Sequence, residues 1–306
     1  MNTHSENERL DFESYRPLLF SIAYRMLGSV ADAEDMVQDT YLRVDAVAQD
    51  TIENPRAYLC AVLTHLCIDH LRSAHSRREV ATGVTLPEPV MASLVALPTD
   101  TATLAESLSI AFLTMLQSLA PIERAAFILH EVFDFDYDEV ARIVGKTAVN
   151  CRQIVNRARK SIGGGTSRFE ASPDEVRKIV ERFIRATQSG DLTSLLELLS
   201  PDVTLSADGG SRGVHYGAIR TLRHPLRGAR TVAQFLVAAR AQVPPTFRNE
   251  IREVNLAPSI VTYAGDKLFG VVSFDVAEHR IRNLFILADP DKLKNLGSRP
   301  LVRAEV

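Results

Sequence analysis

The chain has 306 residues and a formal net charge of −3, an ordinary balance for a globular protein of two or three domains. It contains no apolar run of the roughly 18 residues that a membrane helix needs, and its polar start MNTHSENERLDF lacks the layout of a secretory signal. We therefore expect no membrane association and a cytoplasmic location. The three cysteines, Cys60, Cys67 and Cys151, form no CxxC pair, which argues against a disulfide framework or a zinc site. We interpret them as buried side chains rather than redox sensors, and we expect no metal or cofactor.

Residues 10–78 have the pattern of three helices. Apolar residues from Leu18 to Leu27 recur at the spacing of one buried helix face, and Gly28 is a stop signal. Ser29, three residues before an aspartate, is a start signal for the second helix. The third helix is predicted to begin at Pro55, since proline suits a first helical turn. We expect the inner stripe of the second helix to be Met36, Val37, Tyr41 and Val44.

The rest of the chain divides at changes of composition. Residues 79–103 are rich in proline, serine and threonine and are predicted to be a linker. Helical periodicity resumes over residues 104–162, with a break at Pro121. The glycine run in residues 163–172 predicts a hinge before a separate domain at 173–306.

The last domain has a different pattern. Two amphipathic helices are followed by the β-type runs DVTLSAD, FRNEIREVNL, SIVTYAG, KLFGVVSFDVAE and RIRNLFIL, with one helix at ARTVAQFLVAARAQV. Helices followed by a curved antiparallel sheet predict an α+β domain. The whole chain is therefore expected to hold two all-α domains and then an α+β domain.

The stretch VGKTAVNCRQIVNRARKSI contains five basic residues and no acidic one. A helix, a short turn after Gly145 and a second helix give it the spacing of a helix-turn-helix motif, in which the start of the second helix meets base edges. A solvated basic helix face is the alternative interpretation. The acidic cluster Asp134, Asp136, Asp138 and Glu139 immediately upstream favours DNA binding, because it separates the charges. The predicted DNA-binding residues are Asn150, Arg152 and Gln153 for base edges, Arg157, Arg159 and Lys160 for phosphates, and Lys146 beside the turn.

These two helical blocks together resemble bacterial RNA polymerase sigma factors of the extracytoplasmic-function (ECF) group. DAEDMVQDTYLR resembles part of sigma region 2, and LAPIERAAFILHEVFDFDYDEVARIVGKTAVNCRQIVNRARKSI resembles region 4, so the likeness covers about Leu10 to Ile162. It implies region 2 at 10–78, region 4 at 104–162, and binding to the coiled coil of the largest polymerase subunit and to the flap. The polymerase-binding residues that it implies, acidic or polar and suited to a basic partner, are Asp32, Glu34, Asp35, Gln38 and Asp39.

The third helix resembles the part of region 2 that melts promoter DNA and reads the minus-10 element. Such a site captures unstacked bases beside a basic track. The resemblance places Tyr58, His65, Asp69, His70, Arg72, Arg77 and Arg78 there. A tryptophan is common in the family where Tyr58 stands and an asparagine where His65 stands, so the family's base preference does not carry over. Tyr58 as a plain core aromatic is the alternative.

The C-terminal domain resembles the SnoaL-like branch of the NTF2 fold, a cone of bent sheet and helices. A subgroup of sigma factors carries this extension in place of a separate anti-sigma protein, and three motifs here match that subgroup. They are LPEP (Leu86, Pro87, Glu88 and Pro89), DGGSR (Asp208, Gly209, Gly210, Ser211 and Arg212) and DPDKL (Asp289, Pro290, Asp291, Lys292 and Leu293). We expect the linker motif and the loop motif to bind each other or the DNA-binding blocks, which would tune activity.

The sequence therefore predicts a sigma factor that directs core polymerase to promoters and acts as a monomer. One alternative is a free-standing helix-turn-helix regulator whose last domain senses a small ligand. Another is an isomerase or hydrolase that uses Asp208, His215 or His224 as acid or base. A lone aspartate before two glycines is more often a turn, and a shared fold does not imply catalysis.

Overall fold

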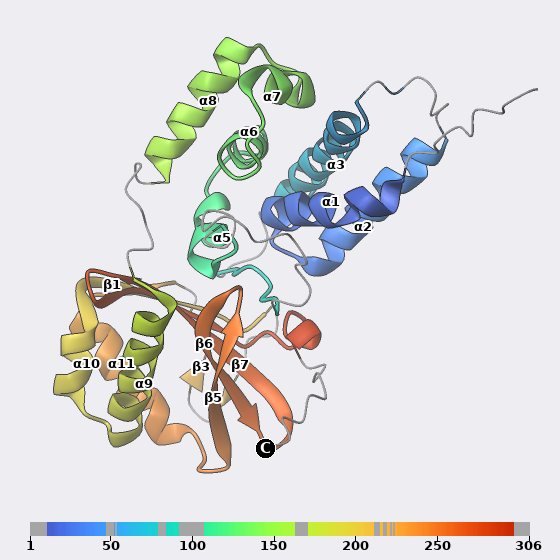
Figure 1. The fold of residues 1–306 in the computed structure, drawn as a ribbon. Coiled ribbons are helices and arrows are strands. Elements are labelled where there is room, and N and C mark those ends of the chain that lie inside the picture. Colours follow the sequence, from blue (N-terminus) through green and yellow to red (C-terminus); the bar gives the residue numbers. More distant parts are fainter. Residues whose placement is uncertain are drawn as a thin grey trace, which may run out of the picture. The chain divides into compact units, whose positions relative to one another are not determined.

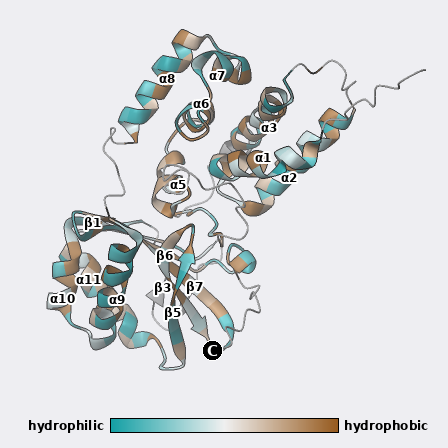
Figure 2. Ribbon diagram, in the orientation of Figure 1, coloured by the Kyte–Doolittle hydropathy of each residue, from teal (hydrophilic) through white to brown (hydrophobic). Residues whose placement is uncertain are grey.

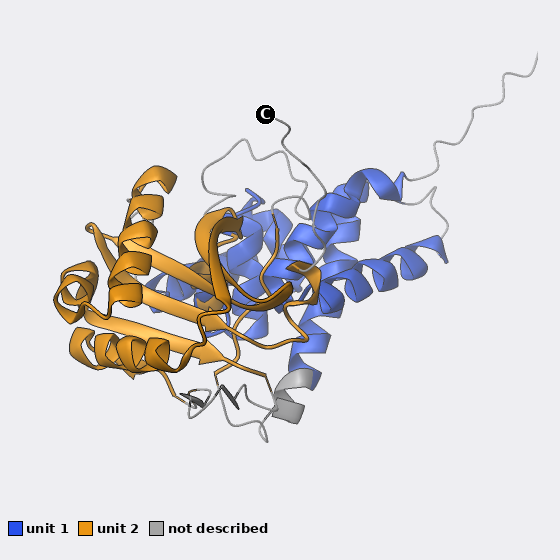
Figure 3. Cartoon of the chain, turned by 90° about the horizontal axis from the view of Figure 1, so that it is seen from below, with its two compact units in different colours: residues 1–79, 95–107, 115–165 blue, residues 80–94, 108–114, 166–306 orange. Residues whose placement is uncertain are grey.

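The computed structural model describes residues 11–46, 52, 54–78, 84–91, 107–162, 171–210, 215–216, 219–220, 222 and 224–296. The chain forms two compact units that do not follow its order (Figure 3). Unit 1 is residues 1–79, 95–107 and 115–165, and unit 2 is residues 80–94, 108–114 and 166–306. Segments from before the helix-turn-helix thus belong with the C-terminal domain.

Three helices open unit 1: α1 (Phe12–Leu27), α2 (Val30–Asp45) and α3 (Pro55–Arg78) (Figure 1). Gly28 ends α1 in the left-handed conformation, and the Ser29 hydroxyl accepts a hydrogen bond from the Asp32 amide at 3.2 Å. These contacts confirm the predicted end of α1 and start of α2.

Tyr41 does not lie on the inner stripe of α2, so that prediction was wrong. Its side chain is 45% exposed, and its ring meets the edge of Phe12 at 5.2 Å between centroids. The partner ring is on α1, outside the periodicity of α2, and it holds Tyr41 at the rim of the helical packing.

Unit 1 continues with α6 (Pro121–Glu131), α7 (Tyr137–Val144) and α8 (Ala148–Ser161), while α5 (Ile110–Leu116) is divided between the units after Thr114. Gly145 is left-handed at the turn between α7 and α8, as the helix-turn-helix requires. The apolar residues that α7 and α8 bury include Val140, Ile143, Val144, Cys151, Ile154 and Val155.

Two buried arginines join α1 to the later helices of unit 1. Arg124 of α6 donates to the carbonyl of Met26 at 2.6 Å, at the end of α1. Arg25 of α1 is 1% exposed, donates to the hydroxyl of Ser107 at 2.9 Å, and lies 5.4 Å from the ring of Phe133. Burial lowers the pKa of Arg25 to about 9, so it still carries its charge at neutral pH.

Unit 2 is built on a six-stranded sheet in the order β4-β1-β8-β7-β6-β5. Helices α9 (Pro173–Ser189), α10 (Leu192–Leu198) and α11 (Ala229–Gln242) pack against it (Figure 1). Its strands are β1 (Leu199–Asp208), β4 (Leu226–Arg227), β5 (Phe247–Val254), β6 (Ala257–Ala264), β7 (Lys267–Ala277) and β8 (Arg280–Leu287). A separate pair, β2 (His215–Tyr216) with β3 (Ile219–Arg220), and the 3-10 turn η3 (Lys294–Leu296) complete the domain.

The predicted antiparallel sheet is correct except at one pair. Strands β1 and β8 are parallel, with Leu205 opposite Leu284. The elements from β2 to β7 lie between these strands in the sequence, so no tight turn connects them, and a parallel pair needs such a long connection. The α+β arrangement itself is confirmed.

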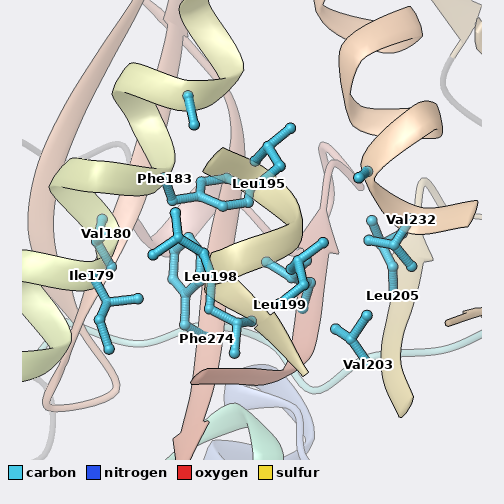
Figure 4. Close-up of a cluster of buried hydrophobic side chains, with 14 of the residues drawn as sticks. Ile179, Val180, Phe183, Leu195, Leu198, Leu199, Val203, Leu205, Val232 and Phe274 are labelled. Carbon is cyan, nitrogen blue, oxygen red and sulfur yellow. The ribbon is translucent and has the colours of Figure 1, made fainter. Parts of the chain in front are cut away.

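The two faces of the sheet bury different parts of the chain. Phe183 and Ile179 of α9 point toward Leu198 and Phe274 in the helix-covered core (Figure 4). Alternate strand residues point the other way, so that Val261 and Phe285 pack with Leu86. Because both faces are covered, consecutive residues of a strand can both be apolar and buried, as Ile260 and Val261 are. Hydrophobic residues accordingly occur along the strands as well as the helices of this unit (Figure 2).

No helix among the described residues is long and apolar enough to cross a membrane. Within the same part of the chain, no three histidine, cysteine or acidic side chains gather where they could hold a metal ion.

Buried thiols generate the first prediction. All three cysteines are buried, and burial raises the pKa of Cys60 to about 12 and also raises the pKa of Cys67 and of Cys151. Because the thiolate is the reactive form, we expect none of them to react with Ellman's reagent at neutral pH until denaturant is added. A thiol that reacts in the native protein as fast as free cysteine would contradict this packing.

Candidate functional site

Asp208 is the centre of a polar cluster in unit 2. It ends β1, and its carboxylate is 5% exposed. Oδ2 accepts hydrogen bonds from the Leu86 amide at 2.8 Å and from Lys292 Nζ at 2.7 Å, while Oδ1 accepts from the Gly210 amide at 2.9 Å. The three predicted motifs therefore meet at one carboxylate. We call this set, Leu86, Asp208, Gly210 and Lys292, the Asp208 clamp.

The linker residues 84–91 lie against the domain as an ordered segment. Lys292 Nζ also donates to the Leu86 carbonyl at 2.6 Å, so Leu86 is held through both its amide and its carbonyl. Pro87 and Pro89 are buried and have no amide hydrogen to satisfy. Glu88 between them accepts a hydrogen bond from Asn295 Nδ2 at 2.5 Å. Proline also restricts the unbound segment, which lowers the entropy cost of docking.

The DGGSR and DPDKL motifs constrain each other's conformation. Gly210 has φ +74°, and a Cβ on it would lie 2.7 Å from the Asp289 carboxylate, so no other residue fits without displacement. Asp289 in turn accepts from the Asp291 amide at 3.0 Å and shapes the turn that presents Lys292. Leu293 is buried in the same cluster as Leu86. Ser211 and Arg212 lie outside the described residues.

Asn255 is a contact residue that the sequence analysis missed. It lies in the turn between β5 and β6, is 2% exposed, and exchanges two hydrogen bonds with Val90 at 2.8 and 3.0 Å. Its Nδ2 also donates to the carbonyl of Leu108 at 2.8 Å. In the sequence, an asparagine between two strands signals only a turn. Its role depends on two segments that are far away in the chain.

The helix-turn-helix presents most of its predicted DNA-binding residues to solvent. Lys146, Asn150, Gln153, Arg157 and Lys160 are exposed, and within the described part of the chain the side chains of Asn150, Gln153 and Lys160 form no ion pair or hydrogen bond. The last four of these positions lie at three- and four-residue intervals and form an exposed polar and basic face on α8, and Lys146 lies in the turn before it.

All three arginines of this set have partners inside unit 1, and Arg157 lies 4.0 Å from Glu123. Arg159 donates to Glu131 at 2.6 Å, and this contact raises its pKa. Arg152 lies 5.1 Å from the ring of Tyr137. The acidic cluster upstream also has a structural part, because Asp136 and Glu139 form the capping box of α7.

The acidic residues of α2 are exposed beside an apolar patch. Glu34, Asp35, Gln38 and Asp39 are exposed and Asp32 is half-buried. An open groove of about 600 Å³ borders this face. The groove is lined by Asp11, Phe12, Glu13, Arg16, Glu34, Gln38 and Tyr41. Tyr41 and Leu42, which the sequence analysis did not assign to this face, are 45% and 57% exposed.

The predicted minus-10 residues share one side of α3. Tyr58, His65, Asp69 and Arg72 recur at intervals of seven, four and three residues, which places them in one stripe. His65, Asp69 and Arg72 are exposed and Tyr58 is half-buried, while His70 lies 3.7 Å from Asp32. Arg72 and Asp69 are 3.6 Å apart. The side chains of Arg77, Arg78 and His215 lie outside the described residues.

Two family matches cover the helical part of the chain. The family described as "Sigma-70 region 2" matches residues 12–77, and "Sigma-70, region 4" matches residues 109–162.

Two relatives match almost the whole length of the chain. The chain is 35% identical over 293 residues to the ECF RNA polymerase sigma factor SigJ of Mycobacterium tuberculosis, covering 92% of each chain. It is 32% identical over 286 residues to the probable ECF RNA polymerase sigma factor SigI of the same species, covering 93% of this chain and 94% of that one. The crystal structure of SigJ matches with a TM-score of 0.73 at 31% identity, over 95% of this chain and 99% of that chain.

The Asp208 clamp generates a second prediction. Asp208→Ala removes the acceptor of the Leu86 amide and leaves Lys292 without its carboxylate, a loss on the order of 1–3 kcal/mol. We expect the Leu86 amide to exchange its hydrogen roughly tenfold faster or more. Hydrogen exchange read by mass spectrometry on residues 84–91 measures this. Asp202→Ala, an exposed position on the same strand, is the matched control, and equal exchange in both variants would contradict the clamp.

Proposed function

Since the chain belongs to the extracytoplasmic-function group of RNA polymerase sigma factors, which bind core polymerase and promoter DNA to start transcription, we propose that its C-terminal domain restrains this activity by holding the linker between the two promoter-reading regions. The observation that carries the proposal is the Asp208 clamp, which ties linker residue Leu86 to the domain through two hydrogen bonds, while a third joins Asp208 to Lys292.

Each helical region has a separate task in this proposal. The stripe of α3 that contains His65 and Arg72 captures the unstacked bases of the minus-10 element, and α8 enters the major groove at the minus-35 element. The acidic face of α2 docks on the coiled coil of the largest polymerase subunit, with Tyr41 and Leu42 as apolar contacts at its centre. Region 4 binds the flap.

Regions 2 and 4 must separate before both can bind the promoter at the same time. Their elements lie about 25 base pairs apart, or about 85 Å along the duplex. In unit 1 the start of α3 touches the segment before α7, because the guanidinium of Arg56 lies 4.3 Å from the ring of Phe135. This contact has to break when each region occupies its own element.

The linker sets how far they can separate. While residues 84–91 and Leu108 are both held on unit 2, only residues 79–83 connect α3 to that unit, and five residues span at most about 20 Å. Once released, residues 79–109 can span about 100 Å, which exceeds the distance between the elements. The clamp therefore opposes the open arrangement that transcription requires.

The remaining features of the proposal follow from this mechanism. Because the restraint is part of the chain, no separate anti-sigma protein is required, and the protein works in the cytoplasm, where polymerase and promoter DNA are found. The clamp needs no small ligand. A free-standing regulator is not favoured, since two sigma regions occur in order and a regulator needs only the second.

Run-off transcription with core RNA polymerase tests the proposed restraint. A pool of genomic fragments supplies the templates, and we expect Asp208→Ala to give more transcript than the unchanged chain at equal concentration of folded protein. The matched control, Asp202→Ala, should leave the yield unchanged. Equal or lower yield from Asp208→Ala would overturn the restraint, and no core-dependent transcript from any of the three proteins would oppose sigma activity itself.

Phosphate contacts by α8 give a separate prediction on salt dependence. The side chain of Lys160 forms no ion pair or hydrogen bond with another described residue, whereas Arg159 is bound to Glu131. We expect Lys160→Gln to reduce the slope of log affinity against log salt by about 0.9 for the holoenzyme on promoter duplex. Arg159→Gln should change this slope less. Equal slope changes for the two variants would show that Arg159 leaves Glu131 to bind phosphate.

A further inference from the structure

Val149 exposes an apolar side chain at the start of the recognition helix. It is the second residue of α8, after the cap Thr147, and it is 66% exposed. Among the described residues, only Tyr41, Leu42 and Val149 are large apolar side chains that are exposed. Tyr41 lines the groove beside α2, and Leu42 is the next residue in the chain. Val149 is therefore the one large apolar side chain that is exposed among the described residues of the helix-turn-helix.

The fold does not explain this residue. The buried face of α8 consists of Cys151, Ile154, Val155 and Ala158, and Val149 is not part of it. A β-branched residue also has a lower helix propensity than alanine, and its exposed methyl groups gain nothing from water. Valine at this position thus lowers local helix stability and leaves apolar surface uncovered.

The neighbours of Val149 are polar groups suited to base edges. Asn150 follows it, and Gln153 lies one turn further along the same side of α8. Val149 therefore projects from the end of the helix that meets the bases in a helix-turn-helix. The main apolar group that a base edge offers in the major groove is the C5 methyl of thymine.

We propose that Val149 packs against the C5 methyl of one thymine in the minus-35 element and so contributes to promoter choice. The inference rests on the proposed placement of α8 in the major groove. It assigns Val149 a contact with the base itself, next to the hydrogen bonds expected from Asn150 and Gln153.

The test replaces the methyl group and the side chain separately. A promoter is first selected from genomic fragments by the full chain with core polymerase, and each minus-35 thymine is then replaced by deoxyuridine, which lacks only the methyl. We expect one replacement to weaken binding of the unchanged holoenzyme about fourfold, the value of one buried methyl group. Val149→Ala should weaken binding to the thymine promoter by a similar factor and show no further loss with deoxyuridine.

Controls keep this test interpretable. Val149→Ala raises helix propensity, so misfolding is not expected, and Ser161→Ala at the exposed end of the same helix should retain the full deoxyuridine effect. The inference is overturned if the element has no thymine, if no replacement weakens the unchanged holoenzyme, or if Val149→Ala keeps the penalty. A loss of core binding by Val149→Ala would assign the residue to the polymerase. Failure of all variants to form core-dependent complexes would reject the proposed function as well.

Discussion

The structure of the C-terminal unit depends on the buried carboxylate of Asp208. A charge with 5% exposure loses most of its hydration, which only strong donors can offset. Those donors are the ammonium of Lys292 and the amides of Leu86 and Gly210, from three segments far apart in the chain. Burying one ionised group therefore requires the linker, the loop after β1 and the turn after β8 to assemble together. If any one of these three segments is displaced, the Asp208 carboxylate loses a hydrogen-bond donor and becomes more exposed to water.

In the proposed mechanism, this assembly separates control of activity from DNA recognition. The clamp binds the connection between the two sigma regions, while the residues predicted to contact bases, such as Asn150 and Gln153, are exposed to solvent. In this mechanism the length of free linker limits the separation of regions 2 and 4. The C-terminal domain therefore does not need to imitate DNA or to contact the residues predicted to bind bases. It also explains why the linker carries two buried prolines, since a stiff segment docks with a smaller loss of entropy than a flexible one.

Features governed by nearby residues were predictable from the sequence. Gly28 and Ser29 mark the end of one helix and the start of the next because their backbone and hydroxyl groups act within a few residues. The helix-turn-helix followed from the apolar periodicity on either side of Gly145. The three motifs of the clamp were identified by resemblance, and contact between the linker motif and the loop motif was one of the two expected arrangements. That DPDKL joins them at one carboxylate was not predicted. Tyr41 was misplaced because its partner, Phe12, lies on another helix.

The sequence alone determined the helices, their ends, the α+β character of the last domain and the residue types that suit promoter DNA. These properties arise from local hydrogen bonding and from periodic burial. Only the tertiary structure decided that the linker belongs with the C-terminal domain, that β1 runs parallel to β8, and that Asn255 holds Val90 and Leu108. Each of these depends on contacts between residues more than 70 positions apart, and no local pattern specifies which distant partner a polar group or strand edge will find.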